Sequence, residues 1–208
     1  MHKFVLACLI LCCACLALGQ AGIAGSAHDF SDETWSHGQI CLPCHTPHNA
    51  NTTVAEAPLW NHELTAVATY TLYSTTSLDA TVGQPNGTSR LCLSCHDGTV
   101  ALENFGGVTN GTAFVTGTIL VGNGANLSGD HPVSFTYDAA LAATDGGLHD
   151  PTVTASGLIG GGTISDDMLS GGTMQSSSCH EVHNECGHNS LLILDNGGSA
   201  LCLTCHDK

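Results

Sequence analysis

Apolar residues along this chain form short runs that Gly, Ser, Thr and Asn interrupt, with one exception at the start. There the apolar run from residue 4 to residue 18 is unbroken and follows one His and one Lys. A short basic start, an apolar stretch of this length and small residues behind it are typical of a secretory signal peptide. The pattern therefore predicts a signal peptide over residues 1–21, cleaved after Ala21, with Ala24 and Ala27 as alternative positions.

A membrane anchor and a lipoprotein signal are the competing interpretations of this run. An anchor needs about 20 apolar residues to span a bilayer, which is more than the run offers. Cys12, Cys13 and Cys15 lie in the run, but none follows the Leu-small-small pattern that precedes a lipidated cysteine. We therefore expect a chain that is secreted to the periplasm or the cell surface and keeps no membrane anchor after cleavage.

The remaining apolar runs predict short elements. Residues 99–107, 112–122 and 131–137 carry apolar runs broken by Asn-Gly and Gly-Gly pairs, a pattern that indicates short strands and hairpins. Residues 137–143 (YDAALAA) predict a helix of about two turns. We expect a mostly irregular, loop-rich fold with short α-helices near the cysteine motifs and minor β-hairpins.

Composition adds two constraints. Aromatic residues make up only 5% of the chain and 25 residues are Gly, so a conventional side-chain core would be small and something else must fill the middle. The chain has 18 acidic residues, whereas only Arg90 and Lys208 remain basic after cleavage. Nucleic acid and anionic membrane surfaces are therefore poor partners, because almost nothing would neutralise their phosphates.

Two short patterns each occur twice, in alternation. CLPCHTPHN at residues 41–49 resembles SSSCHEVHN at 176–184, and TSRLCLSCHD at 88–97 resembles GSALCLTCHD at 198–207. The shared order indicates a doubled unit. We therefore predict a single domain over 22–208, with the doubled unit in residues 22–100 and 170–208 and a Gly/Thr-rich insert between them.

Three of these patterns contain CxxCH, which is the attachment site of a c-type haem. Both thiols add to the haem vinyl groups, and the adjacent His can then ligate iron. Paired CxxC motifs also form zinc sites and redox-active dithiols, but a His after every pair and the predicted export favour haem. The predicted thioether residues are Cys41, Cys44, Cys92, Cys95, Cys202 and Cys205, with His45, His96 and His206 as the proximal iron ligands.

The second axial ligand decides what a haem can do. Iron with two protein ligands has no open position and is suited to electron transfer. Histidine is abundant outside the motifs, whereas Met is scarce, so we expect bis-His ligation. The distal candidates are His28, His48, His62, His131 and His183. His37, His149 and His188 are better explained as surface or hydrogen-bonding residues.

The SSSCH string departs from the other motifs, because Ser176 stands where the first cysteine would be. Three outcomes are open for this fourth site. A single thioether from Cys179, with His180 as the proximal ligand, is the favoured one. The site could instead be empty or hold haem without a covalent bond, or Cys179 could form a disulfide with Cys186.

Seven stretches together resemble the doubled-CXXCH family of multihaem c-type cytochromes, and within it the secreted tetrahaem cytochromes that polymerise into extracellular filaments. They are HDFS, CLPCHTPHNA, PLWNHE, LCLSCHDGTVAL, DHPVSF, SSCHEVHN and LCLTCHDK. The resemblance covers nearly the whole mature chain, from about residue 22 to residue 208. The resemblance implies four bis-His haems stacked in a continuous row that fills the core, and electron flow through a filament of identical subunits. It also implies that the adjacent subunit lends one distal His, for which His28 is a candidate.

The resulting functional prediction is an exported electron-transfer protein, whose partners are other copies of itself and redox proteins, rather than an enzyme. Two alternatives remain. A monomeric periplasmic shuttle would have the same haem sites. A multihaem reductase would need one five-coordinate haem and basic residues to bind an anion, and Arg90 is nearly the only one available.

Overall fold

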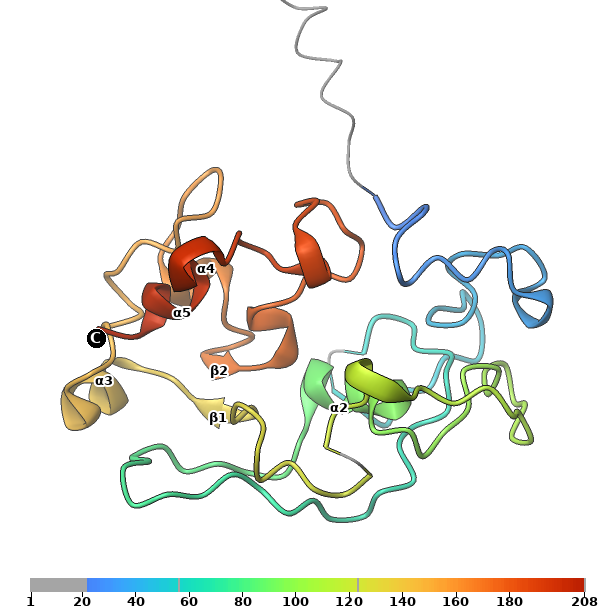
Figure 1. Cartoon of the computed structure of the whole chain (residues 1–208), viewed down its shortest axis with the longest axis horizontal. Coiled ribbons are helices and arrows are strands. Elements are labelled where there is room, and N and C mark those ends of the chain that lie inside the picture. Colours follow the sequence, from blue (N-terminus) through green and yellow to red (C-terminus); the bar gives the residue numbers. More distant parts are fainter. Residues whose placement is uncertain (1–21, 56, 123, 208) are drawn as a thin grey trace, which may run out of the picture.

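The computed structural model describes residues 22–55, 57–122 and 124–207. The predicted signal peptide lies outside the described residues. Loops dominate the fold, as expected, and short elements interrupt them (Figure 1). The α-helices are α2 (Gly87–His96), α3 (Ala139–Asp145), α4 (Ile164–Asp167) and α5 (Ala200–Cys205). The 3₁₀ turns are η1 (Thr34–Ser36), η2 (Gly117–Ile119), η3 (Ser176–Ser178), η4 (Asn189–Leu191) and η5 (Gly197–Ser199).

Helix α2 is the longest described helix and carries the second cysteine motif near the middle of the molecule (Figure 1). It contains no Gly or Pro after its first residue, so nothing interrupts its backbone hydrogen bonds. Its leucines point to two different clusters: Leu91 packs with Val54 and Trp60, and Leu93 packs with Tyr70 and Leu127. The helix therefore connects two small apolar clusters.

The predicted helix over residues 137–143 is confirmed as α3, shifted by two residues. Asp138 caps it by accepting a hydrogen bond from the Leu141 amide at 2.8 Å, and this cap sets the start of the helix. Gly146, with φ of 68°, ends it in the left-handed conformation that glycine adopts without strain.

The strand predictions for the insert are largely wrong. Only residues 131–137 contain a strand, β1 (Phe135–Thr136), which pairs antiparallel with β2 (Thr173–Met174). Residues 99–107 and 112–122 contain no strand, and the second range holds η2 instead. Backbone amides in these ranges bond to side chains instead of to a neighbouring strand. The Glu103 carboxylate accepts hydrogen bonds from the amides of Thr112 and Ala113.

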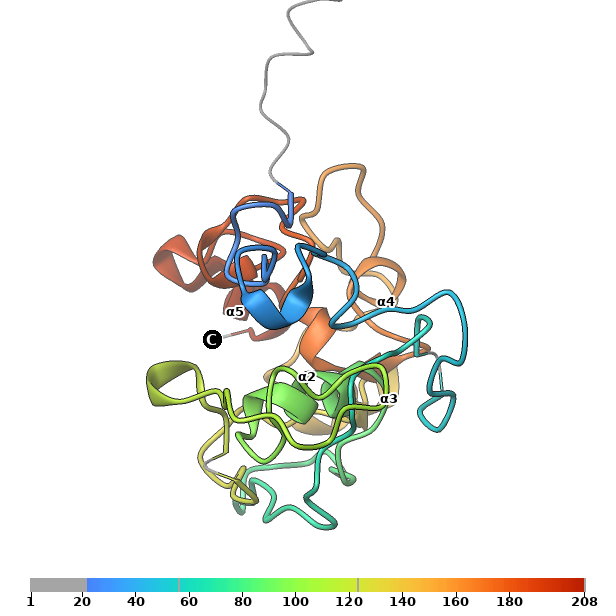
Figure 2. The same ribbon diagram turned by 90° about the vertical axis from the view of Figure 1, so that its right-hand side faces the viewer.

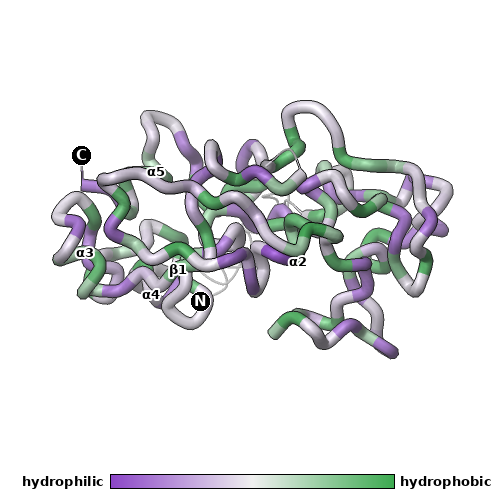
Figure 3. The backbone as a smooth tube through the Cα atoms, turned by 90° about the horizontal axis from the view of Figure 1, so that it is seen from below, coloured by the Kyte–Doolittle hydropathy of each residue, from purple (hydrophilic) through white to green (hydrophobic). Residues whose placement is uncertain are grey.

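The side-chain core is divided. The largest cluster gathers buried residues from the sheet, α3, α4 and α5, and the two clusters on α2 are separate from it. Apolar segments accordingly are spread along the chain in Figure 3 instead of gathering in one layer. Among the described residues, no helix is long and apolar enough to cross a bilayer.

The N-terminal segment lies against the C-terminal part of the chain, as the turned view in Figure 2 also indicates. The Asn184 side chain donates a hydrogen bond to the Gly22 carbonyl at 3.1 Å. Phe30 and Trp35 then lead toward Phe105 through ring contacts, with centroids 5.3 and 6.1 Å apart. This segment therefore contacts both the second repeat and the start of the insert.

Candidate functional site

Three of the four cysteine-histidine motifs share a tight backbone turn. The motif His amide donates to the carbonyl four residues before it, at 2.8 Å for His45, 3.0 Å for His180 and 3.0 Å for His206. At the second motif, the last turn of α2 takes the place of this turn, and the helix ends at His96. In each case the turn places the second cysteine and the imidazole next to each other.

The backbone around SSSCH forms the same hydrogen bonds as the backbone around CLPCH. Thr46 donates its amide to the Leu59 carbonyl at 2.9 Å, and Glu181 donates in the same way to Leu191 at 2.7 Å. Asn61 and Ile193 then donate back to the carbonyls of the second cysteines, at 2.9 and 3.0 Å.

Backbone conformations repeat as well. Asn49 and Asn184 have φ of 57° and 59°, and Leu59 and Leu191 have φ of 54° and 56°. A leucine with a left-handed backbone conformation is uncommon, so its recurrence at the same place in both repeats indicates that the two segments share one local fold. The loss of the first cysteine has left the local fold of the motif intact.

The motif imidazoles are oriented through one ring nitrogen. Nδ1 of His45, His96 and His180 lies 2.6, 2.9 and 2.9 Å from the carbonyl oxygens of Pro58, Ile119 and Ser190, respectively. A carbonyl can only accept, so each Nδ1 carries the proton and Nε2 keeps the lone pair that binds a metal.

Two distal candidates are oriented in the same way. His131 Nδ1 lies 2.9 Å from the Pro132 carbonyl, and His183 Nδ1 lies 3.0 Å from a carboxylate oxygen of Glu181. The second arrangement is the carboxylate–histidine pairing that is common around metal ligands. Both residues therefore also present Nε2 as a free ligand.

The structure brings motif and non-motif histidines together in three pairs. The ring centroids lie 6.3 Å apart for His45–His183, 5.9 Å for His28–His96 and 6.4 Å for His131–His206. Two imidazoles on opposite sides of one metal, each nitrogen about 2 Å from it, have ring centres roughly 6 Å apart.

Aromatic rings in general pair at about 4.5–7 Å, so this spacing alone is not diagnostic. The identity of the paired residues is diagnostic, because each pair joins one motif histidine to one histidine from the predicted distal set. The donor sets therefore fit iron with two axial imidazoles.

Two distal candidates are placed differently. His48 is exposed and faces no motif histidine among the described residues. His62 is buried, and its two ring nitrogens lie 2.7 and 3.1 Å from the carbonyls of Glu63 and Ala101. Burial lowers the pKa of His62, so the ring is neutral near pH 7 and can donate to only one of them.

His28 is partly buried beside His96, within the same chain. Its Nδ1 is a buried atom without a hydrogen-bond partner, an arrangement that is costly unless a ligand satisfies it. Burial lowers the pKa of His28, and the nearby His96, His180 and His183 lower it further. The ring is therefore neutral and lies close to imidazoles of two different motifs, the second and the third.

The motif thiols lie close to one another in two groups. Burial raises the pKa of Cys44 to about 11, with a further contribution from nearby Cys92. Burial likewise raises the pKa of Cys205 to about 11, and Cys179 lies near enough to add to the shift. The first and second motifs are thus neighbours, and so are the third and fourth.

The eight cysteines from Cys41 to Cys205 are free thiols, and Cys179 is not joined to Cys186. Within the three described ranges, no group of three or more His, Cys, Asp or Glu side chains is placed to hold one metal ion. The histidines lie in pairs, whereas structural zinc needs four converging ligands.

Ser176, at the position of the missing cysteine, contacts α2. Its amide donates to Ser89 Oγ at 2.9 Å, its hydroxyl lies 3.2 Å from the same atom, and it lies within hydrogen-bonding reach of Cys92. Gln175 extends this junction, because its buried side chain bonds to Ser89 and Asn86. The serine therefore connects the third motif to the second.

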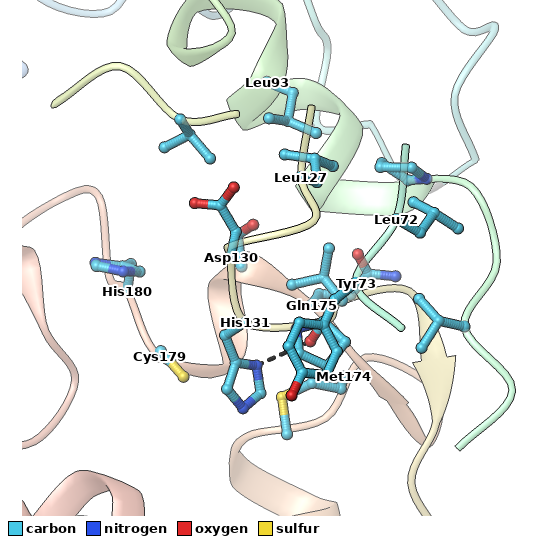
Figure 4. Close-up of a pocket in the computed structure, with 16 residues that line it drawn as sticks. Leu72, Tyr73, Leu93, Leu127, Asp130, His131, Met174, Gln175, Cys179 and His180 are labelled. Carbon is cyan, nitrogen blue, oxygen red and sulfur yellow. Dashed lines mark hydrogen bonds between the residues drawn. The ribbon is translucent and has the colours of Figure 1, made fainter. Parts of the chain in front are cut away.

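A pocket with a volume of about 240 Å³ opens beside the third motif. It is somewhat smaller than the roughly 300–1,000 Å³ of pockets for drug-sized ligands. Ser176, Cys179 and His180 line it, opposite mainly aliphatic side chains (Figure 4). The third motif thus has a cavity beside it, which His131 also lines.

Each of the four motifs also has an exposed apolar side chain beside it. The exposed fractions are 56% for Leu59, 59% for Ile119, 38% for Val182 and 44% for Leu203. Leu59 and Ile119 belong to the segments that orient His45 and His96. A flat apolar cofactor lying on each motif would cover such surface.

The orienting carbonyls of Pro58, Ile119 and Ser190 were not predicted from the sequence. A backbone carbonyl belongs to every residue type, so no letter in the sequence marks it. The spacing of the repeat is the one available signal, because Pro58 and Ser190 occupy equivalent places after their motifs. No protein-family model matches the chain, and no curated protein matches it.

Proposed function

We propose that this chain is an exported multihaem c-type cytochrome that carries electrons through closely packed haems. The observation that supports it best is the set of three imidazole pairs, each formed by a motif histidine and a histidine from outside CxxCH. The cysteines of the same motifs are free to form the thioethers. Each bound haem would supply an iron that takes up and releases one electron.

Three haems would be held by two thioethers each, from Cys41 and Cys44, Cys92 and Cys95, and Cys202 and Cys205. The fourth would be held by Cys179 alone, with His180 as its proximal ligand. The preserved turn, the oriented imidazole and the adjoining pocket support the fourth site. Because Ser176 is engaged with α2, its replacement of cysteine does not disturb the motif.

The positions of the predicted haem anchors support close packing of the haems. Cys44 and Cys92 belong to different motifs, as do Cys179 and Cys205, and each pair lies near enough to influence the pKa of its thiols. His183, from the third motif, faces His45 of the first. Neighbouring redox centres permit rapid electron transfer, and paired axial imidazoles keep iron from reacting with other ligands.

Assembly into extracellular filaments is a further part of the proposal and rests on the family resemblance. Negative-stain microscopy of the secreted, haem-loaded protein tests it. Filaments are the expected result, and compact monomers alone at high concentration would argue for a periplasmic shuttle.

Intact mass and haem content together test the haem sites. The full chain is expressed in a host with c-type maturation machinery and exported. We expect the mass of residues 22–208 plus four covalent haems, and a pyridine haemochrome spectrum that includes one haem with a single thioether. Three covalent haems would contradict the assignment at Cys179, and none would contradict the proposed function.

The Ser176→Cys variant is the matched control for this test, because it restores the CxxCH pattern. Its mass should again correspond to four haems, while the single-thioether component of the haemochrome spectrum disappears. A spectrum that Ser176→Cys leaves unchanged would mean that Cys179 does not carry haem.

A further inference from the structure

Asp97 is the only buried carboxylate among the described residues, and it is 1% exposed. It directly follows His96, the proximal ligand predicted for the second motif. Its amide donates a hydrogen bond to the Leu93 carbonyl at 3.0 Å, at the end of α2. The helix therefore holds this side chain close to the second motif.

Four hydrogen bonds are donated to the Asp97 carboxylate. The hydroxyls of Tyr70 and Thr65 donate to Oδ2, the first of them at 2.6 Å. The amide and the hydroxyl of Thr99 donate to Oδ1 at 2.8 and 2.7 Å. Burial and the bond to Asp97 raise the pKa of Tyr70, so the phenol keeps its proton and remains a donor. Such a set of donors favours the ionised carboxylate.

No cation neutralises this charge. Arg90 is the one Lys or Arg within the described ranges, and no ion pair joins it to Asp97. Arg90 lies near enough to Tyr70 to influence its pKa. The donors that contact the carboxylate itself are neutral hydroxyls and an amide, which stabilise its charge without cancelling it.

The charge of Asp97 reaches Cys95, a predicted thioether residue of the same motif. Burial raises the pKa of the Cys95 thiol, and nearby Cys44, Cys92 and Asp97 raise it further. Charges in a buried region are screened much less than charges in water. A haem attached to Cys95 would therefore lie within the field of this carboxylate.

We propose that the buried carboxylate of Asp97 lowers the reduction potential of the haem at the second motif. Uptake of one electron lowers the positive charge of the iron by one, so a fixed negative charge nearby favours the oxidised state. This inference rests on the proposed function. It assigns to one residue an effect on how electrons are distributed among the four haems.

The fourth motif offers a comparison within the same chain. It reads LCLTCHD where the second motif reads LCLSCHD, so Asp207 occupies the place of Asp97. Asp207 is exposed, and its amide donates to the Gly147 carbonyl at 2.9 Å. Water and salt screen an exposed charge, so Asp207 should affect its haem only weakly.

Spectroelectrochemical titration of the haem-loaded Asp97→Asn protein tests the inference, with Asp207→Asn as the matched control. We expect Asp97→Asn to raise the potential of one of the four haems. Its ratio of reduced to oxidised form at a fixed potential should increase about tenfold, which corresponds to about 59 mV for one electron. Asp207→Asn should change this ratio by no more than about twofold at any haem.

Intact mass establishes that each variant carries four haems. Titration curves that Asp97→Asn leaves unchanged, or equal shifts in the two Asp→Asn variants, would overturn the inference and leave the proposed function standing. A protein without covalent haem would contradict the proposed function itself.

Tyr70→Phe separates the effect of charge from that of packing and does not depend on the folding of Asp97→Asn. It removes one donor and keeps the carboxylate, whose charge is then less well stabilised by hydrogen bonds. The potential of the same haem should fall, with roughly a two- to threefold decrease in its ratio of reduced to oxidised form. A disturbance of packing alone would move both variants in the same direction, so a rise in potential in Tyr70→Phe would overturn the inference.

Discussion

At the scale of single residues, the orientation of each imidazole determines which nitrogen is available. Five of the predicted ligands use Nδ1 for a hydrogen bond to an oxygen atom and keep Nε2 free. They are His45, His96, His131, His180 and His183. A side chain that is fixed in this way loses little freedom on binding iron, which favours tight ligation.

The pair His45–His183 allows a direct test of a distal assignment. In His183→Met, a thioether replaces the imidazole opposite His45, and His/Met iron has a higher potential than bis-His iron. We expect one of the four haems to rise in potential on the order of 0.1–0.3 V, a part of the roughly 0.8 V that axial ligands span. Spectroelectrochemistry measures it.

His188→Met is the control, since His188 forms no ring pair with a motif histidine among the described residues. Its redox titration should match that of the unaltered protein. If both variants gave the same titration curve, His183 would not be an axial ligand.

At the scale of elements, hydrogen bonds between η3 and α2 join the two repeats. Gln175 is 3% exposed and accepts from the Ser89 amide at 3.2 Å and from the Ser134 hydroxyl at 3.3 Å. Its amide nitrogen donates to Asn86 Oδ1 at 2.8 Å. One side chain therefore connects the start of α2, the segment before β1 and the start of η3.

Gln175→Ala removes these bonds and leaves the buried Ser89 amide without its side-chain acceptor. The expected loss is about 2–4 kcal/mol, because unsatisfied buried polar groups cost about 1–3 kcal/mol each. For a chain of this size this lowers Tm by roughly 5–15 °C.

Thermal unfolding of the haem-loaded protein, followed by circular dichroism, measures the effect. Gln39→Ala, at an exposed glutamine, serves as the comparison and should leave Tm within about 1–2 °C, as expected for a surface change. Similar Tm values for the two glutamine variants would show that the η3–α2 junction contributes little.

Comparing the predicted helices and strands with the observed ones shows which of them the sequence determines locally. The alternating repeats predicted the four motifs, and the YDAALAA stretch predicted α3, because a capping Asp and a closing Gly are local signals. The strands predicted over residues 99–107 and 112–122 do not form. A strand needs a neighbouring strand to pair with, and no local pattern indicates that the Glu103 carboxylate accepts hydrogen bonds from the amides of Thr112 and Ala113 instead.

At the scale of the whole molecule, the sequence indicated which histidines are candidate ligands but not which of them lie opposite each other. The residue types and the CxxCH spacing predicted that imidazoles would gather around haems. Which imidazole faces which depends on contacts between distant segments, such as His28 with His96 and His45 with His183. Those contacts follow from tertiary packing, for which local patterns carry no signal.

The divided core suggests that the cofactors are needed for folding. The side chains form three small clusters, and apolar residues beside all four motifs are exposed. A chain with few aromatic residues gains little from burying side chains alone, whereas four large apolar macrocycles would join the clusters into one core. Haem binding would then contribute directly to the free energy of folding, as binding to the native state alone does.

The haem-free chain provides the test. Produced in a host without maturation machinery, it should lack a cooperative thermal transition and be cleaved rapidly by protease, while the haem-loaded chain melts cooperatively and resists cleavage. Because thioethers form covalently, the two forms do not interconvert and can be compared under identical conditions. A haem-free chain with a sharp transition near that of the loaded protein would mean that the three side-chain clusters suffice, and that the haems occupy a fold which exists without them.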